Sequence, residues 1–83
     1  DIYTQHRVDP ETPGEETVGA LSRLVEVGKV RYIGLSEAGP ETIGKAHVIH
    51  PLVCIETEYS LWSRDVEEYI LPLCRKLGIS LMP

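Results

Sequence analysis

The sequence predicts an α/β fold in which short parallel strands alternate with helices. Four short stretches carry the β-branched and aromatic residues that strands favour, and three stretches with helix-type apolar spacing separate them. The strand-type stretches are mostly apolar rather than alternating, which is typical of strands covered on both faces in a parallel sheet. The expected strands are residues 1–5, 29–35, 52–55 and 79–82, and the third could run on to residue 58.

The first expected helix lies between the first two strands and has readable ends. Thr12 and Glu15 have the spacing of a capping box, with Pro13 at the first helical position. Gly28 is expected to end the helix at the position just beyond its last turn. One apolar stripe is formed by Val18, Leu21, Leu24 and Val25.

The second expected helix is shorter. It runs from Pro40 to about Val48 and buries Ile43 and Ala46, and Pro51 prevents its extension because proline cannot continue a helix.

The third expected helix begins with Asp65 as N-cap and Glu68 three residues later, and it stops at Gly78. Pro72 should kink this helix, because its ring crowds the carbonyl of Glu68 and it has no N–H to donate. The side chains expected to be buried are Ile70, Leu73, Cys74 and Leu77.

The resulting order is β-α-β-α-β-α-β, with right-handed crossovers between parallel strands. Two architectures have this order: an open doubly wound sheet and a segment of a (β/α)₈ barrel. Gly34, Gly39 and Gly44 follow the second strand but do not form the G-x-G-x-x-G motif of a nucleotide-binding open sheet. The barrel is favoured because polar residues gather where the strands end.

Those polar residues are the main functional signal. His6 follows the first strand, Ser36 and Glu37 follow the second, and Glu56 follows the third. A barrel brings the carboxyl ends of its strands to one rim, where its active site is built, so we expect these side chains to converge. Each also has an ordinary interpretation: a hydrogen-bonded strand-end histidine, a turn serine and solvated carboxylates.

Composition narrows the function further. The chain has 42% hydrophobic and 25% charged residues and a net charge of −5, which is typical of a soluble globular protein. With 13 acidic against 8 basic residues and no long apolar run, we expect neither nucleic acid nor membrane as a partner. Two cysteines favour a reducing, cytoplasmic location over a disulfide framework. Apolar residues reach both termini, so we expect a segment cut from a larger domain.

Other candidate residues have competing interpretations. His47, His50 and Cys54 invite a metal site, but without a Cys-x-x-Cys pair ordinary packing is favoured. Trp62, with Tyr59, could line a substrate pocket or pack over the rim. Arg64 could meet an anionic substrate or a neighbouring carboxylate.

Three ordered motifs resemble the aldo-keto reductase family, and within it the branch of perakine-type reductases and auxin-induced-like oxidoreductases. They are residues 6–10 (HRVDP), 28–38 (GKVRYIGLSEA) and 58–65 (EYSLWSRD), and the resemblance covers essentially the whole chain. It implies a (β/α)₈ barrel that uses NADP(H) to reduce aldehydes and ketones, its small-molecule carbonyl substrates. In that frame residues 1–83 are a partial domain, truncated at both ends, from about strand 4 to strand 7.

The resemblance also implies roles for individual residues. His6 matches the active-site histidine that orients and polarises the substrate carbonyl. Ser36 matches the serine that hydrogen-bonds the nicotinamide carboxamide. Glu37 stands in the cofactor site where many members have Asn, and Glu56 stands where the carboxamide-binding Gln normally lies. The family's catalytic aspartate, tyrosine and lysine precede strand 4, so the segment alone should be inactive.

Two other functions stay open at this level. One is a regulatory or binding protein that keeps the reductase fold, as potassium-channel β-subunits do. The other is an unrelated phosphate-handling barrel, which would carry a Gly-rich anion site after strands 7 and 8. Whichever holds, the two strand edges near residues 1–5 and 79–82 are expected to be unpaired and to invite self-association.

Overall fold

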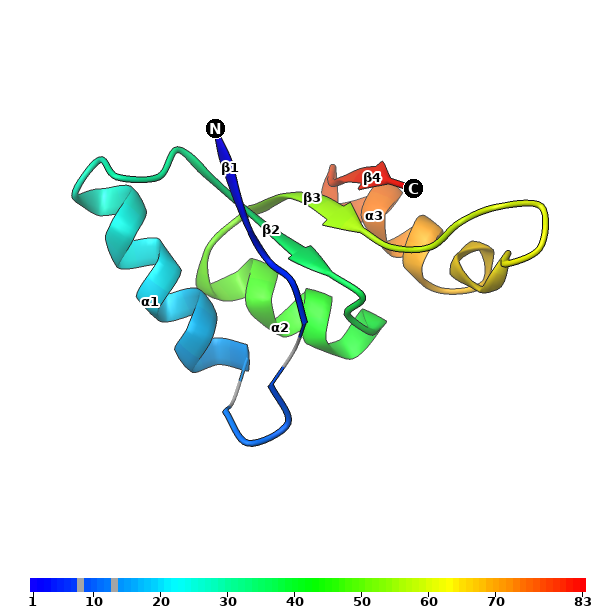
Figure 1. The fold of residues 1–83 in the computed structure, drawn as a ribbon, viewed down its shortest axis with the longest axis horizontal. Coiled ribbons are helices and arrows are strands. Elements are labelled where there is room, and N and C mark those ends of the chain that lie inside the picture. Colours follow the sequence, from blue (N-terminus) through cyan, green and yellow to red (C-terminus); the bar gives the residue numbers. More distant parts are fainter. Residues whose placement is uncertain (8, 13) are drawn as a thin grey trace.

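The computed structural model describes residues 1–7, 9–12 and 14–83. Its four strands form one parallel sheet in strict chain order (Figure 1). The bounds are β1 (Ile2–Gln5), β2 (Tyr32–Ser36), β3 (Leu52–Glu56) and β4 (Ser80–Met82). A doubly wound sheet reverses its strand order, so the sequential order favours the barrel. The predicted parallel β-α-β-α-β-α-β arrangement is confirmed.

Helices fill the connections between the strands. They are α1 (Gly14–Glu26), α2 (Pro40–Ile49), the short 3₁₀ helix η1 (Asp65–Glu67) and α3 (Ile70–Leu77). In Figure 1, α1 and α2 lie side by side and α3 lies against β4, and contacts within both pairs agree with this view.

The sheet has two unlike faces. The outer face packs on the helices: Ile33, Leu35 and Ile55 from the strands are almost completely buried in one core with residues of α1, α2 and α3. The helix residues of that core include Val18, Leu21, Ile43, Ala46 and Cys74. The inner face lines an open hollow of about 440 Å³. Its lining is Ile2, Tyr32, Val53, Cys54, Ser80, Leu81 and Met82.

The end of α1 explains why β2 starts later than expected. Gly28 has φ 79° and donates its N–H to the Val25 carbonyl, while Lys29 donates to the Leu24 carbonyl, both at 3.0 Å. These two bonds form a Schellman motif, which confirms Gly28 as the helix stop. Val30 also donates to Leu24, so residues 29–31 complete the helix end and the strand begins at Tyr32 rather than at Lys29.

The start of α1 differs from the expected capping box. The Thr12 hydroxyl donates to an Asp9 carboxylate oxygen at 3.1 Å, and no bond with Glu15 is found among the described residues. Asp9 also accepts the N–H of Glu11 at 2.9 Å, so Asp9 organises the turn before the helix. Pro13, expected at the first helical position, lies outside the described residues.

The second helix is as predicted: it starts at Pro40, and Ile43 and Ala46 are its buried residues. For the third helix, the predicted start was wrong. Asp65 begins the separate helix η1, and α3 begins at Ile70, so Pro72 is the third residue of α3. First-turn N–H groups have no partner within a helix, so the proline removes no hydrogen bond from α3. Gly78, with φ 73°, ends the helix as predicted.

Candidate functional site

A shallow depression of about 230 Å³ lies where the carboxyl ends of the strands meet. It brings together all four residues that the sequence singled out, from three different strand ends. The depression is lined by His6, Arg7, Ser36, Glu37, Glu56, Thr57, Glu58 and Pro83. The predicted convergence of His6, Ser36 and Glu56 is therefore confirmed.

The pairing of β2 with β3 aligns two of these side chains. Ser36 and Glu56 are register partners at the last position of both strands. Since Leu35 and Ile55, one position earlier, point into the helix-covered core, alternation directs Ser36 and Glu56 to the inner face. Ser36 is 5% exposed, whereas Glu56 is exposed. A buried hydroxyl and a solvated carboxylate thus lie next to each other at the rim.

Gly34 allows the strands to approach closely below this pair. A Cβ at Gly34 would lie 3.0 Å from the Cys54 carbonyl oxygen and 3.1 Å from the Thr4 hydroxyl. The backbone carbonyl cannot move aside as a flexible side chain could, so a Cβ here would have to push the strands apart by a few tenths of an ångström, and glycine is favoured.

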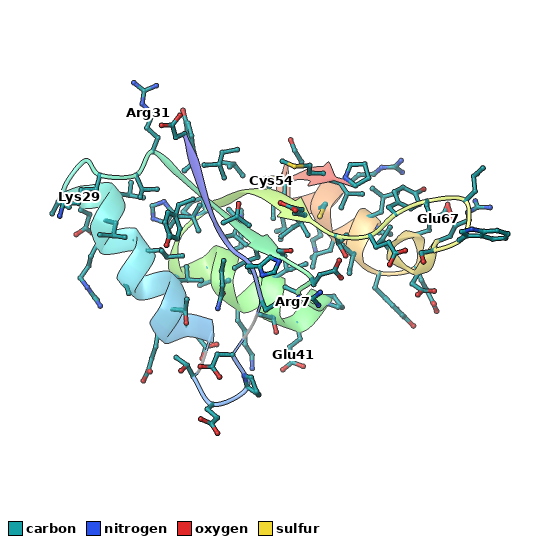
Figure 2. All side chains as sticks on the ribbon, in the orientation of Figure 1. Arg7, Lys29, Arg31, Glu41, Cys54 and Glu67 are labelled. Carbon is teal, nitrogen blue, oxygen red and sulfur yellow. The ribbon has the colours of Figure 1, made fainter. Side chains whose placement is uncertain are left out.

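His6 and Arg7 form the wall of the depression next to β1. Both are exposed and directly follow the strand, and Figure 2 shows Arg7 on this segment. Arg7 was not assigned a role from the sequence, although the cation now faces the same depression as Glu37, Glu56 and Glu58. The signal available was its place in the His-Arg pair immediately after a strand.

Glu37 has an unusual backbone and a fully engaged side chain. Its φ is 52°, the only positive value at a non-glycine among the described residues; a left-handed residue of this kind costs roughly 1–2 kcal/mol. Its carboxylate accepts the Thr57 hydroxyl and the Glu58 N–H, both at 3.0 Å. Its own N–H donates to the Glu56 carbonyl at 2.8 Å. Three hydrogen bonds therefore join the end of β2 to the end of β3.

The loop after β3 is ordered by its own side chains. The Ser60 hydroxyl accepts the N–H groups of Trp62 and Ser63 at 3.2 and 3.0 Å, and the Ser63 hydroxyl donates to Glu58 at 3.1 Å. This turn presents Leu61 and Trp62 to solvent, at 95% and 98% exposure. Trp62 therefore neither lines the depression nor packs over the rim within this chain.

Arg64 meets a neighbouring carboxylate, one of the two alternatives the sequence left open. Its guanidinium donates to both carboxylate oxygens of Glu67, one of them at 3.0 Å. This hydrogen bond lowers the pKa of the Glu67 carboxyl and raises the pKa of the Arg64 guanidinium. The pair lies on the exposed side of η1, so we expect it to add little to stability.

The remaining histidines have packing roles. His47 Nδ1 accepts the Leu52 N–H at 3.0 Å, and this bond joins α2 to β3. His50 Nδ1 lies 3.2 Å from the Ser22 hydroxyl, and this contact joins the end of α2 to α1. Within residues 1–7, 9–12 and 14–83, no cluster of three His, Cys, Asp or Glu residues is arranged to hold a metal ion. The ordinary packing interpretation is favoured for these residues.

Cys54 and Cys74 are free and buried. Burial is the main cause that raises the pKa of both thiols, and the nearby Glu56 carboxylate adds to it at Cys54. Both thiols are therefore suppressed as nucleophiles at neutral pH, and the chemistry of the site falls to its imidazole, hydroxyl and carboxylates.

In the part of the chain that the structure describes, no helix combines the length and the apolarity needed to cross a membrane.

Comparison with known proteins gives a consistent result. The model of the Aldo/keto reductase family matches residues 1–83. A curated relative from Glycine max, described as a probable aldo-keto reductase 1, is 63% identical over all 83 residues. The chain spans about a quarter of that relative's length, 24%.

Solved structures of longer proteins share the fold over 98% of this chain. A thermostable aldo-keto reductase, Tm1743, bound to the inhibitor epalrestat is 36% identical with a TM-score of 0.90, over 31% of its own length. Glycerol dehydrogenase AKR11B4 from Gluconobacter oxydans is 31% identical with a TM-score of 0.94, over 25% of its length. An aldo/keto reductase from Klebsiella pneumoniae bound to NADP and acetate is 29% identical with a TM-score of 0.81, over 29%. The four-stranded sheet is accordingly a segment of a (β/α)₈ barrel.

Proposed function

This chain belongs to the aldo/keto reductase family, and from this premise we propose that it forms part of an NADP(H)-dependent oxidoreductase that reduces aldehydes and ketones to alcohols. One observation carries the proposal: His6, Ser36 and Glu56, which are far apart in the sequence, line one depression at the carboxyl ends of the strands. Active sites of (β/α)₈ enzymes are built at that end of the barrel.

His6 is the proposed catalytic residue of this segment. An imidazole N–H that donates to a substrate carbonyl orients it and stabilises the negative charge that develops on its oxygen. The exposed position of His6 at the edge of the depression leaves the ring accessible to a small carbonyl compound.

Ser36, Glu37 and Glu56 form the proposed cofactor side of the depression. The donor set suits a nicotinamide carboxamide, because a serine hydroxyl can donate and accept and a carboxylate can accept from the amide NH₂. NADPH, when bound, supplies the hydride for the reduction. Because the family's catalytic aspartate, tyrosine and lysine are expected before this segment, we propose that residues 1–83 alone are inactive.

Glu56 gives the site a specific electrostatic property. Its carboxylate, close to the nicotinamide, is expected to favour the positively charged oxidised ring over the neutral reduced ring. In the complete protein, Glu56→Gln should therefore weaken NADP⁺ binding relative to NADPH by about threefold to tenfold, since one charge contact in a half-solvated site is worth about 1 kcal/mol. Cofactor titration measures both constants, and an unchanged ratio between them would contradict this property.

The function is tested by mixing the complete protein with NADPH and a panel of aldehydes and ketones, and following the loss of NADPH absorbance. His6→Gln should lower kcat by about a hundredfold or more, as removal of an oxyanion donor does. His50→Gln is the matched control, because His50 packs against Ser22, and it should retain full activity. Tight NADPH binding without turnover of any carbonyl would instead favour a regulatory protein on the same fold.

We also propose a cytoplasmic location, which is supported by the two free cysteines. Fractionation of cells that express the tagged protein tests it.

A further inference from the structure

We propose that Glu37 is a positioning residue: through Thr57 and Glu58 it fixes the backbone that carries Glu56, and it acts on the cofactor only through that backbone. This inference rests on the proposed function, because the site it serves is the proposed cofactor site. It assigns Glu37 a role distinct from that of Ser36 and Glu56.

The backbone of Glu37 has a conformation that is unfavourable for a glutamate. Ser36 ends β2, and at the next residue the chain turns through the left-handed region with φ 52° and then buries Ala38. Left-handed glutamates persist only where surrounding contacts determine them, and they cluster at functional sites. The Glu37 N–H, bonded to the Glu56 carbonyl, is one such contact.

The side chain supplies the other contacts, and they all go to one short segment. One carboxylate oxygen accepts the Thr57 hydroxyl and the other accepts the Glu58 N–H. Thr57 is buried, and its N–H donates to the Met82 carbonyl of β4 at 3.1 Å. Residues 56–58 are therefore held from both sides, by Glu37 of the β2 end and by Met82 of β4.

The chemistry of the partners suits a carboxylate here. Both partners donate hydrogen bonds, and an ionised carboxylate is the side chain that accepts at both oxygens without offering a donor. Because the Thr57 hydroxyl can also accept, a glutamine could keep both bonds, its oxygen accepting the Glu58 N–H and its NH₂ donating to Thr57, but it would lose the charge. Hydrogen bonds to an ionised acceptor are also stronger than those to a neutral one. Strong bonds are needed here because Glu37, Glu56 and Glu58 line one small depression and their carboxylates repel one another.

Glu37 and Glu56 therefore have different roles within the depression. Glu37 and Glu56 are both exposed and both line the depression. They differ in that both oxygens of Glu37 accept protein donors, whereas the described residues give the Glu56 carboxylate no such donor. The carboxylate of Glu37 sets where the peptide of residues 56–58 lies, and that peptide sets where the Glu56 carboxylate points.

Hydrogen exchange tests the hold that Glu37 has on the loop. In the complete protein, Glu37→Ala should speed exchange of the Glu58 amide by at least about tenfold, because the hydrogen bond to a charged acceptor is lost. Glu41→Ala is the control, since Glu41 is a surface carboxylate that pairs with Lys45, and it should leave Glu58 exchange unchanged. Unchanged exchange in the Glu37 variant would overturn the proposal.

Cofactor binding tests whether Glu37 acts through the loop. Thr57→Val keeps the shape of Thr57 but removes its hydroxyl, and it should weaken NADPH binding in the same direction as Glu37→Ala, each by roughly threefold to tenfold. The double variant should be no weaker than Glu37→Ala alone, and Thr57→Ser, which keeps the hydroxyl, should restore binding. A Glu37 variant that loses affinity while Thr57→Val does not, or losses that simply add, would show direct contact and overturn the proposal.

The two measurements separate this inference from the proposed function. If the parent protein binds neither NADPH nor NADP⁺, the proposed function fails, while exchange of the Glu58 amide still decides whether Glu37 holds the loop. If the parent binds cofactor but the exchange and binding effects are absent, the function stands and the positioning role fails.

Discussion

The two faces of the sheet differ in what they contribute. On the outer face, Ile33 and Ile55 are fully buried under the helices, whereas on the inner face Ile2 and Met82 are each 47% exposed. In a (β/α)₈ barrel the inner face is filled by layers of side chains from all eight strands, and four strands cannot complete those layers. The outer face thus stabilises this segment, and the inner face and its rim carry the candidate site.

The largest expected effect concerns the edges of the inner face. β1 and β4 are the two edge strands of the sheet, and their unpaired backbone groups and bare inner side chains favour association. The isolated 83-residue chain is therefore expected to sediment as oligomers or aggregates at micromolar concentration. A monodisperse monomer with a cooperative melting transition would show that the outer face alone is sufficient.

The next effect compares single side chains on the two faces. Ile55→Ala should lower the free energy of unfolding by about 2–5 kcal/mol, since it leaves a cavity in the helix-covered core. Met82→Ala should cost about 1 kcal/mol or less, because half of this side chain is already exposed. Urea denaturation of the dilute chain measures both, and equal costs would remove the distinction between the faces.

Gly34 offers a smaller test on the inner face. Gly34→Ala should cost about 1–3 kcal/mol, because its Cβ would press on the Cys54 carbonyl. Gly44→Ala, in α2, is the matched control: its Cβ meets nothing within 4 Å, so it should stabilise the helix by about 0.5–1 kcal/mol. Relative to the parent chain, the melting temperature should fall for Gly34→Ala and rise for Gly44→Ala. An unchanged melting temperature in the Gly34 variant would contradict the close approach.

The smallest effect concerns the two thiols. Burial raises the pKa of Cys54 and of Cys74, so both should react with iodoacetamide at least about tenfold more slowly in the folded than in the urea-unfolded chain. A raised pKa in the folded state gives stability that is complete below the ordinary thiol range and lost as the pH rises through it. The urea midpoint should consequently fall at alkaline pH. Rapid alkylation of the folded chain at neutral pH would contradict this.

Much of the fold could be predicted because its signals are local. Gly28 and Gly78 stop helices and Pro40 starts one, and each acts within a few residues of itself. The predicted starts of β2 and β4 were too early because the end of the preceding helix uses backbone N–H groups that a strand would otherwise pair. The N–H of Lys29 completes the end of α1 and that of Ile79 donates to the Cys74 carbonyl, so β2 and β4 both begin later than their apolar residues suggest.

The site was predictable in its members but not in its connections. Parallel strands place His6, Ser36 and Glu56 at one rim whatever their side chains do, so their convergence follows from topology. The contact of Glu37 with Thr57 and Glu58 spans about twenty residues and depends on a left-handed backbone at a glutamate. No local sequence signal marks such a conformation, and Arg7 was missed for a similar reason, since its role depends on what lies opposite.

The strict chain order of the strands bears on how this protein is made. Every strand pairs only with those synthesised just before and just after it, so each new strand finds its partner already in place as it leaves the ribosome. The sheet can therefore grow one strand and one helix at a time, and each step closes only the helical connection between two neighbouring strands. Until the next strand is synthesised, the newest strand has an unpaired edge. A pause in translation at that point should therefore increase the risk of aggregation.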